Sequence, residues 1–84
     1  MKIKTDERYF RSSDFYLCCF LFAKNINLVG IDKDDPKRSI FAFENSVELQ
    51  ELVEEFFQNK ASVNPRLFAS AIKEIKQQIY SNNF

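Results

Sequence analysis

The chain has 84 residues, the size of one small domain, and its 12 basic and 12 acidic residues cancel. A net charge of zero provides no overall field that would favour nucleic acid or an anionic membrane. The chain contains no His, which excludes Ser-His-Asp and Cys-His nucleophile designs and most catalytic zinc sites. We expect a single domain over residues 1–84, with flexible ends at 1–8 and 81–84.

Nine consecutive apolar or aromatic residues occupy positions 15–23. Asp14 and the two serines before it are good N-cap residues, and Asn25 tolerates the left-handed conformation that ends many helices. We therefore expect a helix over 15–24. Because this helix has no polar face, other elements must cover it on nearly all sides, which makes it the predicted centre of the fold.

Basic residues precede this apolar segment, as they do in secretory signal peptides. Asp6, Glu7 and Asp14 interrupt the basic region, however, and no small-x-small cleavage site follows. Nine apolar residues are also fewer than the roughly 20 that span a bilayer. We expect a soluble, cytoplasmic protein.

The two cysteines, Cys18 and Cys19, are adjacent in the apolar segment. Neighbouring helical residues point about 100° apart, so the two thiols cannot form an ordinary disulfide there. We interpret them as small buried apolar residues in a reducing compartment. A vicinal redox pair is the alternative.

Two strands are predicted next, over 26–32 and 38–44. The first segment is rich in β-branched residues, and the second places Phe41 and Phe43 on one face. The intervening Asp-Asp-Pro sequence is typical of a turn, so the strands should form an antiparallel hairpin with a charged end at 33–38.

Two amphipathic helices follow the hairpin. Asn45 and Glu48 have the spacing of a capping box, and the apolar stripe behind them comprises Leu49, Leu52, Val53, Phe56 and Phe57. Asn64-Pro65 is a strong start signal for a helix to about residue 80. Its apolar stripe comprises Phe68, Ala71, Ile72, Ile75 and Ile79.

Residues 60–63 lie between these helices and are predicted to form a short third strand. It would join the hairpin through a right-handed crossover. The predicted fold is therefore α+β in the order α-β-β-α-β-α, with a central apolar helix, an antiparallel hairpin and two further amphipathic helices.

Several segments together resemble an uncharacterised family of small single-domain proteins from bacteria and their phages or integrated elements. The matching segments are 13–17, 20–24, 41–44, 49–57 and 61–65, followed by a basic amphipathic helix. The resemblance covers about residues 9–80. Cys18, Cys19 and Asn25 stand where that pattern would have Ala, Ala and Gly. The resemblance implies no activity, and no functional residue is transferred from it.

The carboxylates do not form a recognisable catalytic or metal-binding set. Asp32, Asp34 and Asp35 resemble the start of a calcium loop but lack its remainder, so we interpret them as a solvated turn. The glutamates of the 45–60 segment lie opposite its apolar stripe, which indicates a solvated face. We predict no catalytic residue, no metal and no cofactor.

Charge is unevenly distributed along the chain. The 45–60 segment carries a net charge of −3 and the 61–84 segment one of +2. One expectation is that these acidic and basic helices lie close together and pair weakly. The other is a basic surface that contacts nucleic acid, made by Lys33, Lys37, Arg38, Arg66, Lys73 and Lys76.

Thirteen aromatic residues are more than an 84-residue core readily buries. Nine aromatic residues are predicted to form the core or an interface: Phe15, Tyr16, Phe20, Phe22, Phe41, Phe43, Phe56, Phe57 and Phe68. We expect a non-enzymatic interaction module that binds either a second copy of itself, as a homodimer, or another protein. The alternatives are a nucleic-acid-binding accessory protein of a mobile element and a monomer with a tight Phe core.

Overall fold

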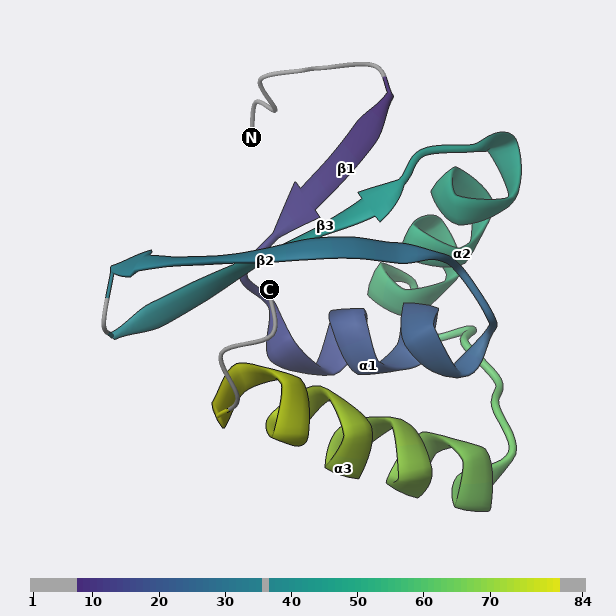
Figure 1. The fold of residues 1–84 in the computed structure, drawn as a ribbon. Coiled ribbons are helices and arrows are strands. Elements are labelled where there is room, and N and C mark those ends of the chain that lie inside the picture. Colours follow the sequence, from purple (N-terminus) through teal and green to yellow (C-terminus); the bar gives the residue numbers. More distant parts are fainter. Residues whose placement is uncertain (1–7, 36, 81–84) are drawn as a thin grey trace.

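The computed structural model describes residues 8–35 and 37–80. The elements are β1 (Tyr9–Ser12), α1 (Phe15–Ala23), β2 (Leu28–Asp35), β3 (Arg38–Glu44), α2 (Val47–Phe57) and α3 (Pro65–Tyr80). The predicted class is confirmed: three helices pack with a three-stranded antiparallel sheet (Figure 1). The predicted flexibility of 1–7 and 81–84 lies outside the described residues. Arg8 is described, and its carbonyl oxygen accepts a backbone hydrogen bond from Asn45.

The predicted hairpin is present as β2 and β3. Strand β2 begins two residues later than predicted and extends through the charged segment to Asp35, so the connection is shorter than expected. A register shift between Leu28 and Gly30 marks an irregularity in the pairing. Phe41 and Phe43 of β3 are both buried on the helical side, as their alternation predicted.

The third strand is not where the sequence predicted it. Residues 60–63 form no strand; the N-terminal segment Tyr9–Ser12 pairs with β3 instead, and the sheet order is β1-β3-β2. With β1 on one edge of β3 and β2 on the other, β3 has no free edge left for 60–63. The observed element order is therefore β-α-β-β-α-α, and the predicted crossover does not occur.

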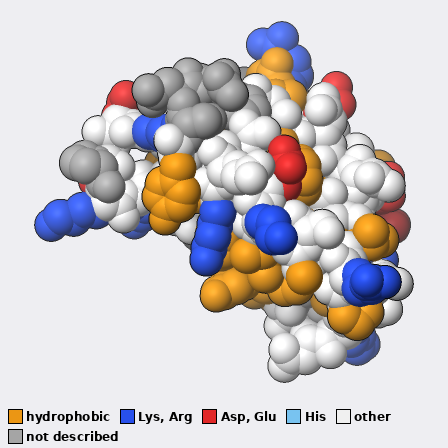
Figure 2. Space-filling view, turned by 60° about the horizontal axis from the view of Figure 1, so that its bottom comes forward, with side chains coloured by type: hydrophobic (Ala, Val, Ile, Leu, Met, Phe, Trp, Pro, Cys, Tyr) orange, Lys and Arg blue, Asp and Glu red, His pale blue; other side chains and the backbone are white. Residues whose placement is uncertain are grey.

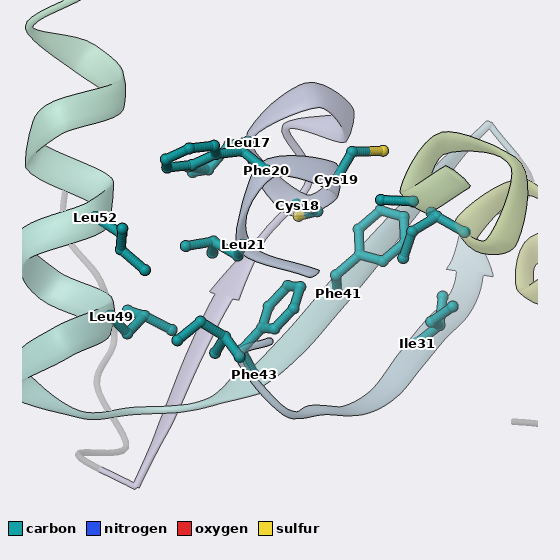
Figure 3. Close-up of a cluster of buried hydrophobic side chains, with 13 residues drawn as sticks. Leu17, Cys18, Cys19, Phe20, Leu21, Ile31, Phe41, Phe43, Leu49 and Leu52 are labelled. Carbon is teal, nitrogen blue, oxygen red and sulfur yellow. The ribbon is translucent and has the colours of Figure 1, made fainter. Parts of the chain in front are cut away.

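Helix α1 packs against both other helices, and the predicted central position is supported in part. The Asp14 carboxylate accepts a hydrogen bond from the Leu17 amide, and Asn25 adopts a φ of 68° just after the helix. Residues 17–21 are buried between the sheet, α2 and α3 (Figure 3). Cover is not complete, however, because Tyr16 is 58% exposed.

Helix α2 differs from its prediction in its N-cap and in the exposure of the last residue of its apolar stripe. The N-cap is Ser46, whose hydroxyl accepts a hydrogen bond from the Leu49 amide, whereas the Asn45 side chain accepts one from the Gln50 side chain. The predicted stripe is buried or half-buried except at its last member. Phe57 is 63% exposed because the helix ends there, and Asn59 at a φ of 61° redirects the chain.

Helix α3 begins as predicted, with the Asn64 side chain accepting hydrogen bonds from the amides of Arg66 and Leu67. It packs against α1 through its predicted stripe, in which Ala71 and Ile75 are buried. In Figure 1, α3 lies on the side of α1 away from the sheet. No helix in the described part of the chain is long and apolar enough to cross a membrane.

Candidate functional site

A band of aromatic side chains links α1 to α2. The ring of Phe20 lies 5.8 Å from that of Phe56, and Phe56 lies 5.3 Å from Phe57 in an edge-to-face contact. Tyr16 stands one turn before Phe20 on the same side of α1. Phe20 is buried and Phe56 half-buried, whereas Tyr16 and Phe57 are both more than half exposed. We call these four residues the aromatic band.

The remaining predicted aromatic residues belong to the core or its margin. Phe41 and Phe43 point from β3 toward α1 (Figure 3). Phe15, Phe22 and Phe68 are half-buried and pack against the core. Of the nine aromatic residues predicted for the core or an interface, these five pack in or against the core, and Tyr16 and Phe57 are the two that are exposed.

The charged faces of α2 and α3 point to solvent. The four exposed glutamates of α2 are Glu48, Glu51, Glu54 and Glu55, and the three exposed basic residues of α3 are Arg66, Lys73 and Lys76. Each helix packs against α1. Within the described residues these seven side chains form no ion pair, so the expected weak pairing of the two helices within one chain is not found.

Figure 2 shows the face on which α3 lies. Hydrophobic side chains gather across the middle of this face, and Lys and Arg side chains border them. Such a combination of apolar area and bordering charge is typical of surfaces that meet another macromolecule.

The six basic residues predicted to contact nucleic acid differ in their exposure and in their contacts. Lys37 and Arg38 are exposed at the end of the hairpin, whereas Lys33 is half-buried. The Lys33 ammonium donates hydrogen bonds to the carbonyl oxygens of Ile79, at 2.8 Å, and Gln78, at 3.2 Å. It therefore caps the C-terminal end of α3, where the free carbonyls and the helix dipole favour a cation.

Replacing this cap should destabilise the fold. Lys33→Met retains most of the apolar stem but removes two charge-assisted hydrogen bonds and a favourable helix-end charge, at an expected cost of about 1–2 kcal/mol. Thermal unfolding should then occur about 5–10 °C lower. Lys37→Met, at an exposed position of the same hairpin, is the matched control and should change the midpoint by less than about 2 °C. Equal midpoints for the two variants would refute the role of Lys33.

The aspartates of the hairpin stabilise their own loop. The Asp32 carboxylate accepts a hydrogen bond from the Asp34 amide, and that of Asp35 accepts one from the Lys37 amide. This is the turn role that the sequence predicted. Among the described residues, no three His, Cys, Asp or Glu side chains are grouped so as to hold a metal ion.

Both cysteines are free and buried, as predicted. Burial raises the pKa of the Cys18 thiol to about 12; a hydrogen bond with the Ser12 side chain opposes this rise, and nearby Asp14 and Cys19 add to it. Burial likewise raises the pKa of Cys19 to about 11, with Lys76 opposing. Since thiolates are the reactive form, both side chains are inert near neutral pH.

Two open grooves lie outside the aromatic band. One, of about 300 Å³, lies over the face of the sheet away from the helices and is lined by Tyr9, Arg11, Val29, Gly30, Ile31, Asp32, Ile40 and Ala42. The other, of about 370 Å³, lies between the end of α1 and the first half of α3. Space around Gly30 is open, since an added Cβ would meet nothing within 4 Å.

The structure thus defines a small α+β domain whose helical layer carries exposed aromatic and charged surfaces. The chain belongs to the family described as Domain of unknown function (DUF5659), whose model matches residues 7–81. The match agrees with the predicted resemblance to an uncharacterised family over most of the chain. Comparison with curated proteins and with solved structures finds no match in either set.

Proposed function

We propose that this domain is a non-enzymatic interaction module that associates with a second copy of itself through its helical layer. The observation that carries the proposal is the aromatic band, in which Tyr16 of α1 and Phe57 of α2 expose 58% and 63% of their surface while Phe20 and Phe56 join the two helices. Burying a large aromatic side chain contributes about 1.5–3 kcal/mol, and aromatic residues are enriched at the centres of interfaces. A second copy would bury this surface twice.

The test is the oligomeric state of a double variant, Tyr16→Ser with Phe57→Ser. Both side chains are exposed, so the fold should survive while the apolar area is lost. Sedimentation equilibrium should show wild-type dimers at high micromolar concentration and at least a tenfold weaker association of the variant.

The matched control is Val29→Ser, an exposed apolar residue on the opposite face of the sheet. Its association should equal that of the wild type. A wild-type chain that stays monomeric at high micromolar concentration would contradict the proposal. If only Val29→Ser lost association, the interface would lie on the sheet and the proposal would be wrong.

The alternative proposal is a nucleic-acid-binding accessory protein of a mobile element. Its support is the exposed basic face of α3, with Arg66, Lys73 and Lys76, to which Lys37 and Arg38 could add from the hairpin. Lys33 would contribute little, because its ammonium already caps α3. Anisotropy of labelled DNA and RNA at 50 mM salt tests it: binding should weaken in Lys73→Glu with Lys76→Glu, and no binding by the wild type would remove the alternative.

The setting proposed for either function is the cytoplasm of a bacterium that carries phage or other mobile elements. The motif resemblance over residues 9–80 supports this origin. Two free, buried cysteines suit a reducing compartment. Fractionation of the source cells, followed by detection of the chain, is the measurement that checks it.

A further inference from the structure

We infer that the second copy docks with its acidic α2 against the basic α3 of the first, so that a two-fold dimer contains this contact twice. The inference rests on the proposed self-association and specifies which surfaces meet. Its basis is the separation of charge between two helices of one neutral chain.

The charges of α2 and α3 are available for a partner. All four glutamates of α2 and all three basic residues of α3 are exposed, and none of them forms an ion pair within the described chain. Among the described residues, the domain therefore presents two faces of opposite sign whose charges are not paired with each other. A second copy is the partner that supplies the complement of both faces at once.

The spacing of the charges also matches. Glu51 and Glu54 are three residues apart on α2, and Lys73 and Lys76 are three residues apart on α3. Residues at this spacing are neighbours on a helix surface, so one pair of carboxylates can face one pair of ammonium groups. Single rim ion pairs are weak, but four such pairs in a two-fold dimer select the partner and its orientation.

Two-fold symmetry makes the arrangement self-consistent. In an isologous interface, if α2 of one copy contacts α3 of the other, then α3 of the first must contact α2 of the second. Helix α1 packs against both α2 and α3 in each copy, so its exposed Tyr16 and the exposed Phe57 of α2 would lie within the interface. Protein–protein interfaces usually have an apolar centre that is surrounded by a polar or charged rim.

Charge reversal provides a sharp test. An acid-reversed variant carries Glu51→Lys and Glu54→Lys, and a base-reversed variant carries Lys73→Glu and Lys76→Glu. Each alone would oppose like charges twice, and its dimer dissociation constant at 50 mM salt should rise at least tenfold. An equimolar mixture of the two variants restores both contacts, so it should form heterodimers within about threefold of wild-type affinity.

The controls separate this inference from the proposed function. Asp34→Lys and Lys37→Glu reverse one charge each at the hairpin, half the charge change of the double variants, and each should associate as the wild type does. Thermal unfolding of every variant verifies that it is folded. If the wild type dimerises but the reversed variants dimerise equally well, or their mixture shows no rescue, the inference is wrong while self-association stands. If the wild type is monomeric in sedimentation equilibrium, both fail.

Discussion

Phe43→Ala is expected to lower the free energy of unfolding by about 3–5 kcal/mol. Phe43 is fully buried in the central strand, where it pairs with Phe10 of β1 and Leu28 of β2, and its ring points toward α1. Removing the ring leaves a cavity that β3, held on both sides, cannot close. A domain of this size has about 4–12 kcal/mol of stability in total, so the loss is a large fraction of it and would unfold a domain whose total lies near the lower end.

Thermal and denaturant unfolding measure this effect. Phe43→Leu, which keeps most of the volume, should lose clearly less stability than Phe43→Ala. Val47→Ala is the surface control, since Val47 is 76% exposed, and should stay within about 0.5 kcal/mol of the wild type. A loss below about 1 kcal/mol for Phe43→Ala would mean that Phe43 is not buried between the central strand of the sheet and α1.

Stability should fall steeply in alkaline solution because of the two buried thiols. Their pKa values in the folded protein are about 12 for Cys18 and about 11 for Cys19, well above the ordinary value of about 9. Between these limits the unfolded chain loses thiol protons that the folded chain retains. The thiols' contribution to the free energy of unfolding is thus fully present below pH 9. It is lost as the pH rises toward the pKa values of the folded protein, by up to about 1.4 kcal/mol per pH unit for each thiol.

The double variant Cys18→Ala with Cys19→Ala isolates this contribution, because the other titrating groups are common to both proteins. Guanidinium unfolding in the presence of a reducing agent should show the wild type losing about 3 kcal/mol more than the variant between pH 8 and pH 10.5. The variant can be less stable at pH 8 without affecting the comparison. Parallel pH profiles would show that the thiols are not buried in the folded state.

Local signals in the sequence predicted the helices well. Asp14 and Asn64 cap helices where their side chains were expected to do so, and Asn25 takes the left-handed conformation. These positions depend on residues a few places away, so the chemistry of the segment decides them. The wrong cap of α2 has the same origin, because Asn45 and Ser46 are neighbouring caps and only the path of the chain selects Ser46.

Features that depend on contacts between residues far apart in the sequence could not be predicted from local signals. β1 has only four residues, and it forms a strand because β3 offers it an unpaired edge more than 25 residues later. Lys33 was predicted as a possible phosphate contact, and its capping role depends on where α3 ends, 45 and 46 residues further along. The burial of Phe20 and the exposure of Phe57 likewise follow from how α2 lies on α1.

The sequence indicated which types of residue would form a candidate surface, but it did not predict where they lie in the fold. The count of aromatic residues predicted an interaction surface, whereas the opposite charges of 45–60 and 61–84 predicted weak pairing within the chain or a basic surface for nucleic acid. Only the structure shows that α2 and α3 each pack on α1 with their charged faces outward, and that Tyr16 and Phe57 are the exposed members of the nine predicted aromatic residues.

An isotope-filtered nuclear Overhauser experiment on an equimolar mixture of labelled and unlabelled chains tests the central claim most directly, because it detects contacts only between copies. Self-association through the helical layer predicts cross-peaks from the rings of Tyr16 and Phe57 to protons of the other copy, including those of α3. Cross-peaks that arise instead from Tyr9 and Val29 on the far face of the sheet, or none at high micromolar concentration, would contradict it.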